Sequence, residues 1–151
     1  MIRFTAIKIL NQPKEEMWQL KKQYHHLAEM VQIGIFIMAL IFHVLVILEF
    51  VPNDIVWGGR ITFKEELYIF ESISIGINIF FLYVLLAYTK KIKTPIGEKF
   101  LKALMWTMCV IFSLNTIGNL LAKTTTETII FTPVTFISAV CCLVLLSREK
   151  S

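Results

Sequence analysis

The chain has 151 residues, of which 56% are hydrophobic and 17% are charged, and its mean hydropathy is +0.69. Soluble domains usually carry about a quarter charged residues, so this composition excludes an ordinary soluble domain and favours an integral membrane protein. The net charge is +4. In a chain this apolar, anionic membrane headgroups rather than nucleic acid are the expected partner of the excess positive charge.

The residues before the first long apolar run predict a helix with one apolar face. Pro13 suits the first position of a helix, and Glu15 and Glu16 suit its first turn, where the helix dipole favours negative charge. The apolar residues that follow recur every three or four positions and therefore share one face. They are Met17, Leu20, Tyr24, Leu27 and Val31.

We therefore expect residues 1–29 to form a cytoplasmic amphipathic segment. Its helix, over residues 13–29, would lie at the membrane surface and bend into the first membrane span. The alternative is a straight cytoplasmic extension of that span. His25 and His26 fall within this segment, but two neighbouring histidines are more typical of the headgroup level than of a metal site, so we predict no metal ion here.

Four apolar runs are long enough to cross a bilayer, because a hydrocarbon core of about 30 Å requires about 20 residues of helix. They are residues 30–51, 67–88, 100–122 and 129–146. The fourth run contains Pro133 but is otherwise continuous. The sequence thus predicts an all-α integral membrane protein, with a four-helix transmembrane domain over residues 30–151 and an N-terminal cytoplasmic amphipathic helix before it.

The basic residues are distributed unevenly between the two sides of these spans. Twelve lysines and arginines fall on the side of the termini and the second loop, whereas only Arg60, Lys64 and Lys123 fall on the other side. Cytoplasmic segments are enriched in lysine and arginine, so both termini are expected in the cytoplasm. No secretory signal or lipidation motif is evident. Together with the small size, this favours a multi-pass protein of a bacterial-type cytoplasmic membrane.

The loop after the first span contains residues with special properties. Trp57 is typical of a membrane interface, Gly58 and Gly59 allow backbone conformations closed to other residues, and Arg60 adds a charge. One interpretation is a well-anchored connection between two spans. The other is a re-entrant lid in which Trp57 and Arg60 fold over the bundle and contact a ligand.

Every span carries its polar residues towards the end that this orientation places outside. Glu71 is the most informative, because a carboxylate inside a bilayer is costly and usually faces a partner, a cavity or a functional site. Ser74 and Asn78 follow it on the same stripe of the helix. The other members of this polar layer are His43, Asn115, Thr116, Asn119, Thr132 and Thr135. Gly76 and Gly118 lie beside the two sets and predict a close approach of the second and third spans.

Two interpretations of this layer are open. It is either a hydrogen-bonded packing network or an outward-facing intramembrane polar pocket. In the second case His43 and Glu71 form an ionisable pair that binds a cation, carries a proton or acts in acid–base chemistry. The residues assigned to the pocket are His43, Glu71, Ser74, Asn78, Asn115, Asn119, Trp57 and Arg60.

The first functional hypothesis is that the protein binds or moves a lipid-like or small cationic ligand. The second is a structural or accessory protein that binds another membrane protein, and the third is an intramembrane acid–base enzyme. No hydrolase, metalloprotease or nucleotide-binding motif is present, and the three cysteines suit apolar packing. We therefore favour a non-enzymatic role without a cofactor or a metal. The bilayer is the expected partner, and a homodimer would enclose a pore that four short helices alone do not.

Overall fold

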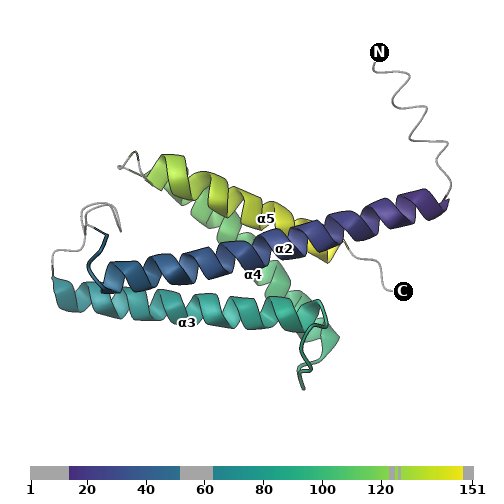
Figure 1. The fold of residues 1–151 in the computed structure, drawn as a ribbon, viewed down its shortest axis with the longest axis horizontal. Coiled ribbons are helices and arrows are strands. Elements are labelled where there is room, and N and C mark those ends of the chain that lie inside the picture. The colour runs from purple at the N-terminus through teal and green to yellow at the C-terminus, as the bar shows by residue number, and fades with distance from the viewer. Residues whose placement is uncertain (1–13, 52–62, 123–124, 126, 148–151) are drawn as a thin grey trace, which may run out of the picture.

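The structure, a computed structural model, describes residues 14–51, 63–122, 125 and 127–147 of the chain. Within these ranges it is all-α, and four helices are long and apolar enough to cross a membrane (Figure 1). The elements are α2 (Lys14–Ile47), α3 (Lys64–Tyr88), α4 (Glu98–Leu120), the π-helical turn η3 (Glu127–Phe131) and α5 (Thr132–Leu146). The four predicted spans are therefore confirmed as helices that could each cross a bilayer.

The first helix differs from the prediction. α2 is one continuous helix of 34 residues, so a separate amphipathic helix over residues 13–29 is not observed in the described part, which begins at residue 14. No proline interrupts residues 14–47, and the i to i−4 hydrogen bonds can continue from turn to turn. The N-terminal part of α2 projects beyond the other three helices as a direct extension of the first span (Figure 1).

α2 and α3 both end with a residue in the left-handed conformation. Glu49 (φ 60°) and Lys90 (φ 63°) occupy the position after a helix where glycine is most common. After α2, the Phe50 N–H donates to the Leu45 carbonyl at 3.0 Å and the Glu49 N–H donates to the Val46 carbonyl at 3.0 Å. A non-glycine residue costs about 1–2 kcal/mol in this conformation, so side-chain contacts must help to hold Glu49 in place.

The fourth span begins with a wide turn. η3 is π-helical over five residues, and α5 follows with Pro133 in its first turn. Proline has no N–H to donate to the preceding turn, and single π turns occur where the regular hydrogen-bond pattern is interrupted. The proline therefore changes the geometry of the first turn without ending the span.

The helices form an antiparallel bundle in which α4 packs mainly against α5, and α2 packs against both α3 and α5 (Figure 1). We call the end that holds residues 89–97, between α3 and α4, the turn end, and the opposite end the Glu49 end. The main buried cluster lies in the half of the bundle nearer the turn end. Its members are Ala28, Phe36, Phe81, Val84, Leu85, Met105, Met108, Cys109, Cys141, Cys142, Leu145 and Leu146.

The core is different in the half nearer the Glu49 end. The second buried cluster of the described residues consists of Val46 of α2 and Leu67 of α3, with Phe42 and Val51 packed against it. It joins only these two helices. The four helices therefore share a common core towards the turn end, whereas towards the Glu49 end α2 and α3 form one packed pair.

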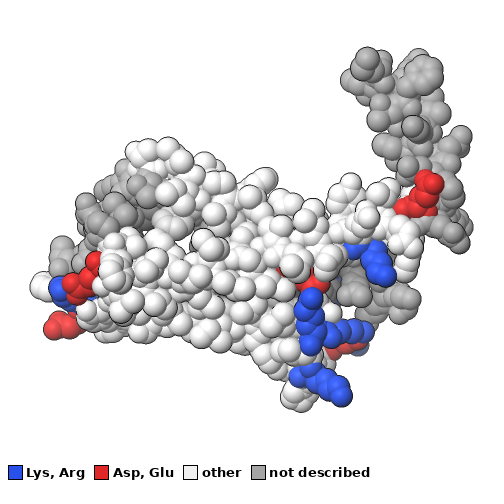
Figure 2. Space-filling model, in the orientation of Figure 1, with Lys and Arg blue, Asp and Glu red and all other residues white. Residues whose placement is uncertain are grey.

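The surface suits a lipid environment. Many large apolar side chains are exposed on all four helices, and on the face shown in Figure 2 the charged side chains gather at the two ends of the bundle with an uncharged belt between them. Exposed apolar area on this scale marks an interaction with lipid or with another protein. Together with the length of the helices, it indicates a multi-pass membrane protein.

Candidate functional site

Glu71 is almost completely buried, and His43 is its partner across the α2–α3 interface. The Glu71 side chain is 1% exposed and the His43 side chain is 17% exposed. His43 Nδ1 lies 2.6 Å from Glu71 Oε2, a short hydrogen bond between an imidazole nitrogen and a carboxyl oxygen. The structure thus brings together the two residues that the sequence singled out as an ionisable pair.

The surroundings of this pair are apolar and aromatic. The Phe42 ring contacts the His43 imidazole at 5.9 Å between ring centroids, and it contacts the Phe131 ring at 5.5 Å. The second contact joins α2 to η3 in the half nearer the Glu49 end. A carboxyl and an imidazole at this distance share one proton, which lies on Nδ1 in the ion pair and on the carboxyl in the neutral pair.

Ser74 and Asn78 continue the Glu71 stripe of α3, as predicted, and both are half-buried. The Asn78 Nδ2 donates to the Ser74 carbonyl oxygen at 2.9 Å, one turn earlier in the same helix. This hydrogen bond satisfies part of the Asn78 amide within α3. It does not link Asn78 to another span.

The polar residues of α4 turn towards α5. The buried Thr116 hydroxyl donates to Thr135 Oγ1 at 3.0 Å, and Asn119 Nδ2 donates to the same oxygen at 3.4 Å. The Thr128 hydroxyl donates to the Asn119 carbonyl at 3.1 Å. Asn115, in contrast, is exposed. The polar layer is therefore divided into a His43–Glu71 pair between α2 and α3 and a threonine–asparagine cluster between α4 and α5.

The expected close approach of the second and third spans at their small residues is not observed. A Cβ atom added to Gly76 or to Gly118 would meet no neighbouring atom within 4 Å. α4 contacts α3 elsewhere along its length but packs mainly against α5. Both glycines and Asn115 therefore contribute to open surface on their helices.

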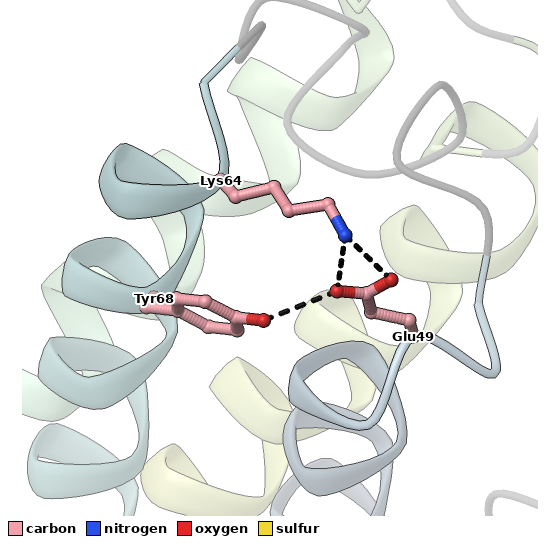
Figure 3. Close-up of polar contacts among 3 residues, drawn as sticks. All are labelled: Glu49, Lys64 and Tyr68. Carbon is pink, nitrogen blue, oxygen red and sulfur yellow. Dashed lines mark hydrogen bonds and ion pairs between the residues drawn. The ribbon is translucent and has the colours of Figure 1, made fainter.

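A second polar contact between α2 and α3 lies at the Glu49 end (Figure 3). Lys64 Nζ donates to both carboxylate oxygens of Glu49, at 2.7 and 2.8 Å, and the Tyr68 hydroxyl donates to Glu49 Oε1 at 3.1 Å. These bonds hold the residue whose backbone is left-handed. The sequence does not reveal this contact, since nothing in the spacing shows which residue of α3 faces Glu49.

Glu49→Gln is expected to have only a small effect on thermal stability in detergent, because both charged side chains are exposed and screened by water and salt. Hydrogen bonds from Lys64 and then Tyr68 hold the pKa of the Glu49 carboxyl below its ordinary value of 4.5. A lowered folded-state pKa stabilises the fold above the unfolded-state pKa, and this contribution is lost as the pH falls through the folded-state pKa. The small difference between wild type and variant should therefore shrink as the pH falls below 4.5 and disappear once the pH is below the lowered folded-state pKa. A difference that grows in acid would contradict this assignment.

The remaining predicted site residues, Trp57 and Arg60, lie outside the described residues, so their part in a site stays a prediction. Among the residues that the structure does describe, no group of three histidine, cysteine or acidic side chains lies close enough to hold a metal ion. Cys109, Cys141 and Cys142 are buried free thiols.

Comparison with known proteins adds no family: the chain matches no protein-family model, and no curated protein or solved structure is significantly similar to it.

Proposed function

We propose that the protein binds an amphiphilic cation, either a lipid-like molecule or a small organic ion, at the His43–Glu71 pair. The observation that carries this proposal is the unequal burial of the two partners. The carboxylate is 1% exposed, whereas the imidazole that neutralises it is 17% exposed. A cation that approaches from the side of His43 can take the place of the imidazole as the partner of the Glu71 carboxylate.

The apolar part of such a ligand has suitable surface beside the pair. Ser74 and Asn78 are half-buried on the Glu71 stripe of α3, and the Phe42 ring, which contacts Phe131, lies beside His43. Binding sites for small molecules combine a mostly apolar lining with a few polar groups that fix the orientation of the ligand. One buried carboxylate among apolar side chains favours a ligand with a single positive charge.

We further propose that the Glu49 end faces the outside of a bacterial-type cytoplasmic membrane. The support is the distribution of basic residues, because Lys90, Lys91, Lys93, Lys99 and Lys102 all lie in or next to the α3–α4 turn. Blue side chains gather towards that end in Figure 2. Cytoplasmic loops carry this excess of lysine, so the ligand would reach Glu71 from the outer side.

A second candidate function is a structural or accessory role in which the pair only links α2 to α3. The short 2.6 Å hydrogen bond favours it, since such a bond can serve simply to fix two helices together. This role predicts that Glu71→Gln loses stability, whereas a binding role predicts that it keeps its stability and loses a ligand.

The test uses the purified full-length chain and tetraphenylphosphonium, an amphiphilic cation, with binding followed by equilibrium dialysis. Wild type is expected to bind saturably, and Glu71→Gln is expected to bind at least tenfold more weakly because its amide carries no charge. Glu71→Asp keeps the charge and should retain binding. Glu49→Gln removes a carboxylate from the same end of the same helix pair and is the matched control.

Equal binding by wild type and a folded Glu71→Gln variant would overturn the proposal. Mass spectrometry of the purified protein provides an independent measurement, since a bound natural cation should be present in wild type and absent from Glu71→Gln. A large loss of thermal stability in Glu71→Gln together with no saturable binding by wild type would favour the structural role instead.

A further inference from the structure

Gln32 is a fully buried polar side chain in the half of the bundle nearer the turn end. It is 0% exposed, and neither its Nε2 nor its Oε1 has a hydrogen-bond partner among the described residues. Ser138 of α5 is also 0% exposed, and its hydroxyl lacks a partner in the same ranges of the chain. Burying an amide or a hydroxyl without a hydrogen-bond partner costs free energy in an apolar medium. We therefore expect each of these two side chains to have a role that offsets this cost.

Gln32 and Ser138 lie at nearly the same level of the bundle. His25 Nε2 and Ser147 Oγ are 3.3 Å apart, which fixes the register of the antiparallel helices α2 and α5 near the turn end. Gln32 follows His25 by seven residues and Ser138 precedes Ser147 by nine. At about 1.5 Å per residue, the two side chains differ in depth by about 3 Å. Buried water molecules at this level would satisfy the Gln32 amide and the Ser138 hydroxyl.

Ionisable residues lie on either side of Gln32 along the same inward face of α2. Glu29 precedes it by three residues, and the Glu29 carboxylate is 12% exposed and 3.6 Å from Lys91 Nζ. His43 follows Gln32 by eleven residues, about 16 Å along the helix. Eleven residues return a helix to almost the same face, so Glu29, Gln32 and His43 form one line along the buried side of α2.

An aromatic cluster separates Gln32 from the His43–Glu71 pair. The Phe36, Phe81 and Phe112 rings, from three different helices, contact one another with centroid distances of 6.0 to 6.4 Å. Phe36 lies one turn from Gln32 and two turns from His43. Hydrophobic constrictions of this kind control the passage of water and ions through membrane proteins.

We propose that the line from Glu71 to Glu29 is a proton pathway, with Gln32 and Ser138 holding the water that carries protons between the Phe36 cluster and the turn end. A proton enters the His43–Glu71 pair from the Glu49 end, passes along hydrogen-bonded water when the aromatic cluster admits it, and leaves past Glu29. Only O–H and N–H bonds break and form, so no other reactant is needed. This activity goes beyond binding of a cation, although both use Glu71.

The other ionisable groups that face this line are few in the part of the chain that is described. At the turn end, Lys91 of the α3–α4 turn faces Glu29, and His25 of α2 faces Ser147, which follows α5. The buried thiols come from α4 and α5, namely Cys109, Cys141 and Cys142. At the other end, Glu49, Lys64 and Tyr68 satisfy one another. Glu71 and Glu29 are therefore the carboxylates placed to accept and release the proton.

The test is proton flux into liposomes of phosphatidylcholine and phosphatidylglycerol that contain the full-length chain and the pH-sensitive dye pyranine. A potassium diffusion potential set by valinomycin drives proton uptake. Wild type should acidify the lumen faster than protein-free vesicles, and Gln32→Leu should reduce the excess rate at least fivefold. Gln23→Leu makes the same change at an exposed position of the same helix and should keep the wild-type rate.

A wild-type rate equal to that of protein-free vesicles, or an unchanged rate in Gln32→Leu, would overturn the proton pathway. Tetraphenylphosphonium binding separates this failure from failure of the proposed function. Gln32→Leu should bind the probe as wild type does, because Gln32 lies eleven residues, about 16 Å, from His43 along α2. Retained binding without proton flux therefore leaves the binding function standing and removes only the pathway.

Discussion

Replacing His43 by leucine is expected to lower the free energy of unfolding by about 3 kcal/mol, the usual cost of removing one partner from a buried charged pair. The physical reason is that Glu71 is 1% exposed and loses the imidazole that lies 2.6 Å from its carboxylate. Desolvation of the carboxylate is then no longer offset by this partner. Thermal or denaturant unfolding of the detergent-solubilised protein, followed by circular dichroism, measures the change.

The double variant His43→Leu/Glu71→Leu provides the control for this prediction. Removing both partners also removes the buried charge, so the double variant should be more stable than His43→Leu alone and should recover most of the lost stability. A double variant as unstable as the sum of the two single variants would show that His43 and Glu71 act independently. That result would contradict the contact as the source of the effect.

Replacing Phe36 by alanine is expected to have a comparable effect, a loss of about 3–5 kcal/mol, because it leaves a cavity in the common core. Phe36 is 1% exposed and contacts both Phe81 and Phe112, so its ring joins α2 to α3 and α4. Unfolding of the purified protein by urea or by heat measures the loss. The effect tests the conclusion that the four helices share a core mainly in the half nearer the turn end.

Phe136→Ala is the matched control for Phe36→Ala. Phe136 of α5 is 58% exposed on the side of the helix that suits lipid, so removing its ring leaves no cavity. Its effect on stability should be well below that of Phe36→Ala. Equal losses in the two variants would indicate that Phe136 is buried against another protein or a second copy of the chain.

The sequence predicted the fold class because span length and composition depend on the bilayer and not on which helices meet. Residues 67–88 are apolar for the length that a bilayer requires, and α3 covers them. The extension before the first span was predicted less well. Its apolar spacing is helical, but the same spacing fits an interfacial helix and a straight continuation, and only the continuous α2 distinguishes them.

The candidate site was predicted in part for a similar reason. A carboxylate and a histidine inside apolar runs stand out in any sequence, and antiparallel spans bring His43 and Glu71 to one depth. Gln32 was missed because it lies at the start of an apolar run, where a glutamine resembles an interfacial residue. The sequence did contain one indication of its position. Gln32 and His43 are eleven residues apart, and this spacing places both residues on one face of the helix.

What the sequence determined by itself is therefore the presence of four apolar helices, the uneven distribution of lysine and the depth of each polar residue. These features follow from the periodicity of a helix, which depends only on neighbouring residues, and from the thickness of a bilayer, which does not depend on which helices meet. Tertiary structure alone decided that His43 meets Glu71, that Thr116 and Asn119 face Thr135 rather than the second span, and that Gln32 is buried. Those outcomes depend on the rotation and partner of each helix, which are set by side-chain packing between segments far apart in the chain.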